Sequence, residues 1–268
     1  MSRNKLLVLL ALCALALFVA CGGGNKEAAP AGDTASAPAA PAAGSAPAAA
    51  PAASGPAGSV TGSATFAGTS TDTPIAMSAD PVCAGLHKEP VTTGKIVAAN
   101  GKLANVFVYV KSGLPAGATY PAPPAKAEIN QQGCLYHPHI QGMQVGQALV
   151  IKNSDPTLHN IHALPKTNQE FNQGQPFQNM QFEKTFTKPE VMVHFKCDVH
   201  PWMSSYIGVL DHPFFAVTKE DGSFTIPNLP PGKYTLEAWH EELGTQDQDI
   251  TVAAGAPVTA NFDFKPKS

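Results

Sequence analysis

The sequence predicts an all-β fold, and three observations support that prediction. Its second half contains short stretches in which apolar and polar residues alternate, which is the period of half-buried strands. Turn-forming combinations of Gly, Pro and Asp separate these stretches. No stretch after residue 58 has the periodicity of a strongly amphipathic helix. We therefore expect β-sheets, each with one buried face.

Residues 1–20 have the composition of an export signal peptide. Arg3 and Lys5 supply positive charge, and an apolar run of 14 residues follows, from 6 to 19. A membrane-spanning helix needs about 20 apolar residues, so this run is too short to be one. We expect it to be removed after export.

The end of this leader, Leu17-Phe18-Val19-Ala20-Cys21, resembles the lipobox of bacterial lipoproteins, with Phe18 where Leu is usual. The resemblance implies that Cys21 becomes a lipid-modified first residue, anchored in the bacterial cell envelope. Gly22 after this Cys implies sorting to the outer membrane, with the protein facing the periplasm. An ordinary secreted protein that is cut nearby is the alternative.

Residues 21–58 are expected to form a lipidated Cys followed by a disordered linker. From Ala28 to Gly58, 29 of 31 residues are Ala, Pro, Gly or Ser, which leaves almost nothing to bury. The folded part would then be residues 59–268. We expect it to form two domains, a first one at 59–212 and a smaller C-terminal one at 213–268.

The charge balance argues against nucleic acid as a partner. Arg3 is the only arginine, so a chain beginning at Cys21 has 15 lysines and 20 acidic residues, a net charge of −5. Proteins that read nucleic acids depend on arginine and on basic patches. We expect no nucleic-acid binding.

Three cysteines remain after the leader and the lipidated Cys21 are set aside: Cys83, Cys134 and Cys197. Cys83 and Cys134 both lie beside short β-like pieces, and in an exported protein a structural disulfide between them is the expected state. The alternative is a second metal site that also uses His87, His137 and His139. Their spacings do not form a standard zinc pattern. In either case Cys197 is left as a functional thiol.

A compact motif surrounds Cys197. Val191, Val193, Phe195 and Cys197 alternate as on one face of a strand, and the loop that follows reads Cys197-x2-His200-x2-Met203. Thiolate, imidazole and thioether are all ligands that suit copper. Upstream, the predicted strand 146–153 leads into a loop that contains His159 and His162. A second imidazole from that loop would complete the trigonal set of two His and one Cys, with a weak axial Met, of a blue-copper site.

The loop and the upstream His159-Asn160-Ile161-His162 segment resemble those of cupredoxins, most closely amicyanin and pseudoazurin, over residues 142–210. The resemblance implies a Greek-key β-sandwich with one type 1 copper site, ligated by His159, Cys197, His200 and Met203. His162 is the rival to His159. Asp198 departs from the Ser or Thr that usually follows the Cys.

The same resemblance assigns roles around the site. Asn160 corresponds to the residue that braces the Cys loop from outside the ligand set. Pro201 and Trp202 would surround an exposed edge of His200, where a redox partner protein docks and electrons leave.

The last part of the chain contains five predicted strands, at 215–218, 222–226, 233–239, 248–252 and 258–262. Its Asp-Gly-Ser-Phe…Leu-Pro-Pro-Gly-Lys-Tyr order resembles carboxypeptidase-regulatory-like, transthyretin-like β-sandwiches and the related module of rhamnogalacturonan lyases. About 55 residues cannot enclose much of a core alone, so we expect this piece to pack on the copper domain. His212 and His240 are expected at the surface or at an interface.

These features together predict a membrane-tethered, periplasmic one-electron carrier that is not an enzyme. The alternative is a non-redox copper-binding protein, or a surface lipoprotein whose C-terminal module contacts a saccharide or a protein. A copper nitrite reductase would need a further copper site and a second cupredoxin domain, and the sequence indicates neither.

Overall fold

The computed structural model describes residues 55–70 and 72–267. The chain divides into two units, Met1–Ala46 and Pro47–Ser268, and every described residue lies in the second. The predicted signal peptide at 1–20, the lipidated Cys21 and most of the linker therefore lie outside the described residues. Within 55–70 and 72–267, no helix is long and apolar enough to cross a membrane.

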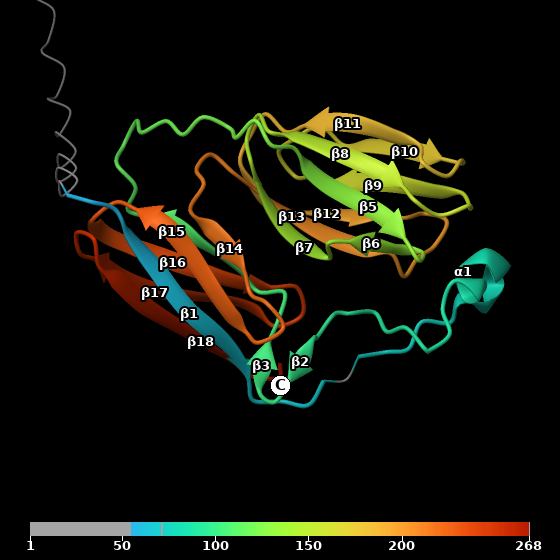
Figure 1. Ribbon diagram of the computed structural model, residues 1–268, viewed down its shortest axis with the longest axis horizontal. Coiled ribbons are helices and arrows are strands. Elements are labelled where there is room, and N and C mark those ends of the chain that lie inside the picture. The colour runs from blue at the N-terminus through green and yellow to red at the C-terminus, as the bar shows by residue number, and fades with distance from the viewer. Residues whose placement is uncertain (1–54, 71, 268) are drawn as a thin grey trace, which may run out of the picture. The chain divides into compact units, whose positions relative to one another are not determined.

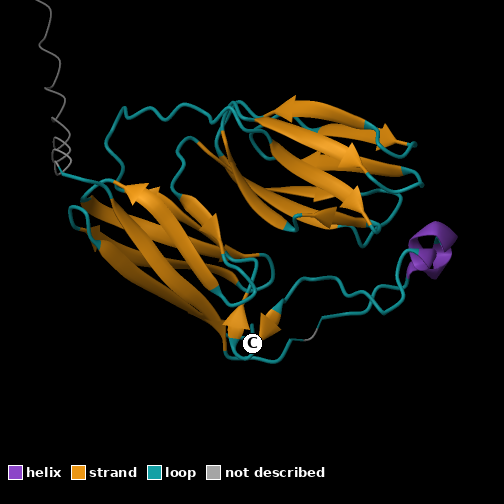
Figure 2. Ribbon diagram, viewed as in Figure 1, coloured by secondary structure: helices purple, strands orange, loops and turns teal. Residues whose placement is uncertain are grey.

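The described residues are almost entirely β-strands and loops, as Figure 2 shows, which confirms the predicted fold class. The helices among them are the 3-10 turn η1 (Met77–Ala79) and the five-residue α1 (Pro81–Gly85). The strands form two β-sandwiches, labelled in Figure 1.

One sandwich is built from both ends of the described chain. Its first sheet combines β1 (Gly58–Phe66), β2 (Ala98–Ala99), β3 (Lys102–Leu103), β15 (Ser223–Leu229) and β18 (Pro257–Phe264). Its second sheet has the order β14 (Phe215–Val217), β4 (Phe107–Ser112), β16 (Gly232–His240), β17 (Gly244–Val252). The facing side chains form one buried apolar cluster that includes Val60, Phe224, Leu236 and Phe262.

The predicted boundary between 59–212 and 213–268 does not follow these sheets. Strand β1 pairs antiparallel with β15 and parallel with β18, and β4 lies between β14 and β16. Of the five strands in 213–268, only β16 and β17 pair directly with each other. The C-terminal piece is therefore completed by strands of the predicted first domain, 59–212.

His212 and His240 were expected at the surface or at an interface, and both are buried, at 5% and 1% exposure. Each Nδ1 accepts a backbone N–H, from Phe214 for His212 and from Glu242 for His240. Burial disfavours the charged imidazole and lowers the pKa of His240 to about 4. The two rings are therefore neutral parts of the interior.

The other sandwich contains the remaining strands in two sheets. One sheet has the order β10 (Phe171–Gln175), β9 (His159–Leu164), β12 (Glu190–Lys196), β13 (Ser204–Leu210), β7 (Ile140–Gln144). The other has the order β11 (Gln181–Thr185), β8 (Ala148–Asn153), β5 (Ala127–Gln132), β6 (Leu135–His137). Strands β9 and β10 form a hairpin, β11 crosses to the other sheet, and β12 returns beside β9. A return of this kind is the Greek-key connection that the sequence predicted.

Strand β12 delivers Cys197 to the interior, with one irregularity. Val193 and Phe195 are fully buried and Cys197 is 2% exposed, as the alternation predicts, but Val191 is 37% exposed. The register with β13 shifts between Glu190 and Val193, and Met192 has a φ of 62°. This bulge reverses the side-chain alternation and turns Val191 outward.

A long segment between β1 and β2, residues 72–97, leaves their sheet and returns to it, and is called the strap. Its two halves run back along each other through the hydrogen bonds Ile75 N to Val91 O and Thr93 N to Thr73 O. Helix α1 lies in its middle, at the right of Figure 1. Met77 and Cys83 of the strap are buried in the core of the Greek-key sandwich. Cys83 thus belongs to a helix, and the expectation that it lies beside a strand is wrong.

Candidate metal centre

The loop from Cys197 to Met203 is closed by its own backbone. Cys197 N donates to Met203 O at 3.3 Å, and Met203 N donates to His200 O at 2.9 Å. His200 N also donates to the Cys197 sulfur at 3.4 Å. Strands β12 and β13 fix the two ends of this loop, so Cys197, His200 and Met203 are held within one tight turn.

His159 reaches the same place from the start of β9. The sequence analysis placed it in a loop, but it is the first residue of that strand. His159, Ile161 and Ala163 are fully buried, and His162, on the opposite face, is half-buried. Because successive strand residues face opposite sides, His159 and His162 cannot both reach the interior.

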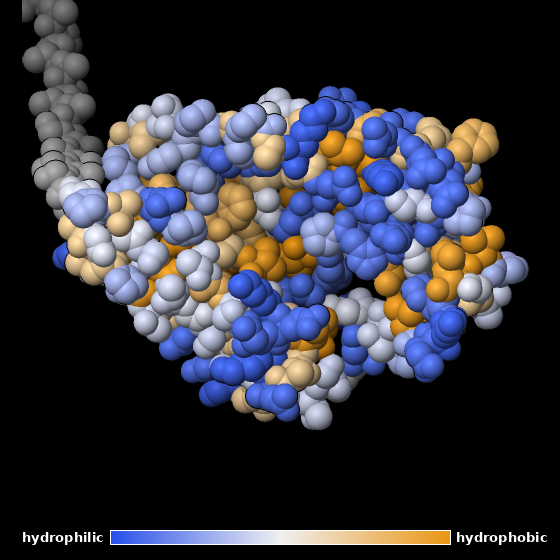
Figure 3. All heavy atoms as spheres, viewed as in Figure 1, coloured by the Kyte–Doolittle hydropathy of each residue, from blue (hydrophilic) through white to orange (hydrophobic). Residues whose placement is uncertain are grey.

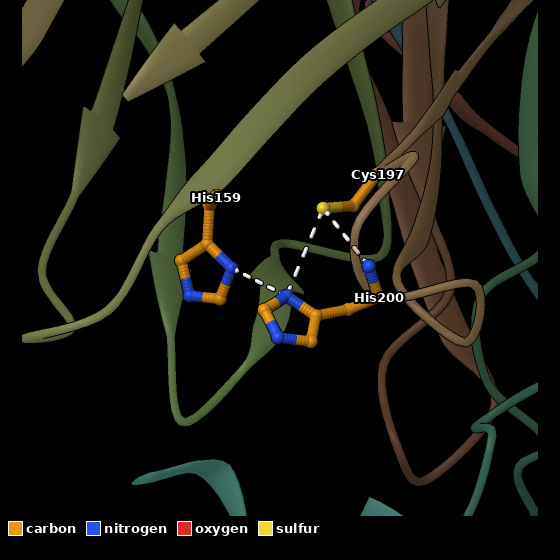
Figure 4. Close-up of side chains that lie close together, drawn as sticks. All are labelled: His159, Cys197 and His200. Atoms are coloured by element: carbon orange, nitrogen blue, oxygen red, sulfur yellow. Dashed lines mark hydrogen bonds between the residues drawn. The ribbon is translucent and has the colours of Figure 1, made fainter. Parts of the chain in front are cut away.

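Three donor atoms converge in the interior, as Figure 4 shows. His159 Nδ1 lies 2.9 Å from His200 Nδ1, and His200 Nδ1 lies 3.8 Å from the Cys197 sulfur. The ligand atoms of His159, Cys197 and His200 all lie within 4.8 Å of one another, and all three residues are buried. Met203, the fourth residue of the predicted set, is fully buried in the same core.

Each imidazole has a carboxylate on its far nitrogen. His159 Nε2–H donates to Asp155 Oδ2 at 3.0 Å, and His200 Nε2–H donates to Asp80 Oδ2 at 2.9 Å. An ionised carboxylate only accepts hydrogen bonds, so each ring carries its proton on Nε2 and has a lone pair on Nδ1. Two lone pairs facing each other at 2.9 Å beside a sulfur repel unless a cation or a proton lies between them. The donor set therefore fits a soft metal ion such as copper.

The local charges favour the thiolate form of Cys197. Burial raises the pKa of its thiol, but the neighbouring His159 ring and nearby backbone N–H groups outweigh burial and lower that pKa. Burial likewise lowers the pKa of His159, but its bond to Asp155 and the nearby Cys197 sulfur outweigh that effect and raise it. The thiolate is the form of cysteine that binds metals.

Asn160 links β9 to the loop after Cys197. Its Oδ1 accepts Asp198 N at 2.7 Å and lies 3.2 Å from the Cys197 sulfur. Its amide nitrogen donates to Asn172 Oδ1 at 2.7 Å and to Asp198 Oδ2 at 3.2 Å, which fixes the orientation of the side chain. Asp198 Oδ1 also forms a salt bridge with Lys196 Nζ at 2.8 Å.

His162, the rival ligand, is engaged outside the cluster. Its Nδ1 lies 3.0 Å from Asp198 Oδ2, and its Nε2 lies 2.8 Å from Glu170 Oε1. It contributes no donor to the group formed by His159, Cys197 and His200.

Cys83 and Cys134 form a disulfide, as the favoured prediction stated. The alternative, a second metal site, is wrong because both sulfurs are used in this bond. The remaining residues of that alternative do not converge either: His87 bonds Gly133 O at 2.7 Å, and His137 bonds Gln132 O at 3.1 Å. Cys197 is the free cysteine among the described residues.

The prediction that an edge of His200 is exposed is wrong. His200 is 2% exposed, because the strap covers it with Asp80 and with the Cys83 sulfur, which lies 3.5 Å from His200 Nε2. Pro201 is exposed, while Trp202 is half-buried. The Trp202 ring centre lies 5.1 Å from that of His200, and its Nε1 donates to Cys134 O.

Asp80 and Asp155 also belong to the site, and neither is predicted from the sequence. Asp80-Pro81 is a helix-start signal, because Asp caps a helix and Pro is favoured in its first turn. That signal could have predicted α1, but not its place over His200. Asp155 precedes His159 by four residues, and no local pattern indicates that the chain turns back to join the two side chains.

The C-terminal part of the chain resembles a known family of domains. Residues 210–265 match the family model described as carboxypeptidase regulatory-like domain, which confirms the predicted C-terminal module. Rhamnogalacturonate lyase A of Emericella nidulans is 34% identical over 58 residues, 22% of this chain and 11% of that protein. A probable rhamnogalacturonate lyase A of Aspergillus clavatus is 34% identical over 55 residues, 20% of this chain and 10% of that protein. The chain thus spans about a tenth of the length of these relatives.

Among solved structures, the similar chains are cupredoxins. A Cu-containing nitrite reductase from Thermus scotoductus SA-01 is 20% identical, with a TM-score of 0.30, over 37% of this chain and 25% of that chain. A purple cupredoxin from Nitrosopumilus maritimus is 22% identical, with a TM-score of 0.28, over 31% of this chain and 99% of that chain. A Cu(I) amicyanin variant is 17% identical, with a TM-score of 0.29, over 38% of this chain and 97% of that chain.

Proposed function

We propose that the protein is a type 1 (blue) copper protein that carries single electrons. The observation that supports this most strongly is the buried convergence of the Cys197 sulfur with the Nδ1 atoms of His159 and His200. Met203, at the end of the same loop, is proposed as the weak axial ligand. When bound, copper supplies the exchange of one electron between Cu(II) and Cu(I).

The residues of this chain would keep the site in one shape during that exchange. Asp155 and Asp80 orient the two rings, and Asn160 fixes the loop after Cys197. Burial of the three donors excludes water from the centre. A site that changes little between two oxidation states exchanges electrons with a small reorganisation cost.

A redox protein is the proposed partner. Leu158 and Val199, each next in sequence to a residue of the site or its loop, are exposed apolar side chains (each 45%). Val82 on α1 and Leu86 just after it are also exposed (37% and 44%). Figure 3 shows hydrophobic surface at and beside the place of α1. Weak redox encounters use small patches of this kind. We propose that the partner docks here, with Pro201 and Trp202 at the rim.

The same proposal places the protein in the bacterial cell envelope, anchored in the outer membrane through lipid on Cys21 and facing the periplasm. It rests on the leader and the lipobox-like segment of the sequence. The linker that follows would let the folded part stand away from the membrane.

A second candidate is a copper-binding protein that does not carry electrons. The observation that favours it is the strap over His200, since a covered imidazole offers a partner no direct contact. A copper-loaded chain that is not reversibly reduced would support this second candidate.

Copper titration tests the ligand set. The full-length chain is expected to bind one copper per molecule, as counted by native mass spectrometry, and Cys197→Ser or His159→Ala should lose this tight binding. His162→Ala is the matched control and should bind as the wild type does, because His162 faces away from the centre. Unchanged binding in Cys197→Ser and His159→Ala would show that copper sits elsewhere.

A further inference from the structure

The outer nitrogen of His200, Nε2, is covered by residues from a distant part of the chain. Its Nε2–H donates to Asp80 Oδ2 at 2.9 Å, and the Cys83 sulfur lies 3.5 Å from the same nitrogen. Both residues come from the strap, about 120 positions earlier in the chain. The ring is therefore held between the donor cluster on one side and the strap on the other.

Asp80 is itself held rigidly. As the N-cap of α1, its Oδ1 accepts Val82 N at 2.8 Å and Cys83 N at 3.1 Å. Its Oδ2 accepts a hydrogen bond from the Thr157 hydroxyl at 3.3 Å, in addition to the one from His200. These bonds also favour the charged carboxylate, and the pKa of Asp80 lies below its usual value, chiefly because of the bond to His200.

The disulfide joins this carboxylate to the one behind the other imidazole. Asp155 accepts Gly133 N at 2.8 Å and Cys134 N at 2.7 Å, and it holds His159. Asp80 lies three residues before Cys83, the other half of the bridge. The disulfide therefore ties the helix that carries Asp80 to the backbone segment that hydrogen-bonds Asp155.

We infer that Asp80 is a positioning residue for His200, which fixes the Nε2–H tautomer of its ring and stabilises Cu(II) relative to Cu(I) by its negative charge. Only the second part of this inference, the effect on Cu(II) relative to Cu(I), rests on the proposed function. A carboxylate that receives the outer N–H of a metal-binding histidine orients the ring and increases its basicity. Its charge would lie one imidazole ring away from the metal, on a side chain that is 21% exposed and therefore only partly screened by water.

Two variants of the full-length chain separate the charge from the hydrogen bond. Asp80→Asn keeps a good helix cap and an acceptor but removes the charge. Its ratio of Cu(II) to Cu(I) affinity is expected to fall about tenfold, a rise in reduction potential of about 59 mV. Asp80→Ala removes the acceptor as well. In the metal-free chain, ¹⁵N NMR is expected to show His200 moving from the Nε2–H form to a mixture of tautomers, at a pH well above the usual histidine pKa.

Asp72→Asn is the matched control. Asp72 holds the same strap through Thr92, Thr93 and Gly94 and has no contact with His200. This variant should keep the wild-type potential and the wild-type tautomer.

The inference is overturned if Asp80→Asn has the potential of Asp72→Asn, or if Asp80→Ala leaves the His200 tautomer unchanged. Failure of the proposed function looks different, because wild-type chain would then show no copper signal that depends on Cys197. The NMR measurement on metal-free protein would still decide the positioning role of Asp80 in that case.

Discussion

Removal of the Cys83–Cys134 disulfide is expected to lower the free energy of unfolding by about 4 kcal/mol, because the bridge closes a loop of 51 residues and restricts the unfolded chain. The double variant Cys83→Ser/Cys134→Ser tests this by denaturant unfolding of the metal-free chain. The strap should also loosen, since Cys83 is its covalent tie to the Greek-key sandwich. Hydrogen exchange should then be faster at the backbone N–H groups of α1.

Wild-type protein treated with a reductant under denaturing conditions and refolded in its presence is the control, and it should match the double variant. An unfolding midpoint equal to that of the oxidised wild type would contradict the structural role of the bridge.

Gly62→Ala is expected to destabilise the chain by about 3 kcal/mol or more, because β1 has no room for a side chain at this position. A Cβ there would lie 1.6 Å from the backbone oxygen of Ala260 and 2.8 Å from the ring of Phe224. Strands β15 and β18 would have to separate from β1, and they depend on it for pairing within their sheet. Thermal unfolding followed by circular dichroism measures the effect.

Gly174→Ala is the matched control, since Gly174 also lies in a strand, β10, and a Cβ there meets nothing within 4 Å. Its stability should stay close to that of the wild type. If Gly62→Ala unfolds at the same temperature as Gly174→Ala, β1 is not packed between β15 and β18 as described.

The sequence predicted the strands of the C-terminal half well because their patterns are local. Tyr234, Leu236 and Ala238 alternate toward one buried face, and turn signals mark the strand ends, as at Asp221-Gly222. Strand β1 was missed for the opposite reason. Most of its residues are small, it follows an Ala- and Pro-rich segment, and its two long pairings, with β15 and β18, join it to strands more than 150 residues away. Pairing over that distance leaves no local signal.

The candidate site divides in the same way. The motif from Cys197 to Met203 and the segment beginning at His159 are short enough to read directly, and the side chains of His159, Cys197 and His200 do converge. What covers His200 depends on a strap from far earlier in the chain, so its burial could not be read from the loop. The exposure of Val191 could not be predicted either. A bulge at Met192 breaks the alternation that the residue types alone suggest.

The optical spectrum of the copper-loaded, full-length chain tests the central claim most directly. Oxidised protein is expected to show an intense visible band from the Cys197 thiolate to Cu(II), which disappears on one-electron reduction and returns on reoxidation. Cys197→Ser should lack that band. A wild-type spectrum with no intense band, or a band that persists in Cys197→Ser, would contradict a type 1 copper centre at His159, Cys197 and His200.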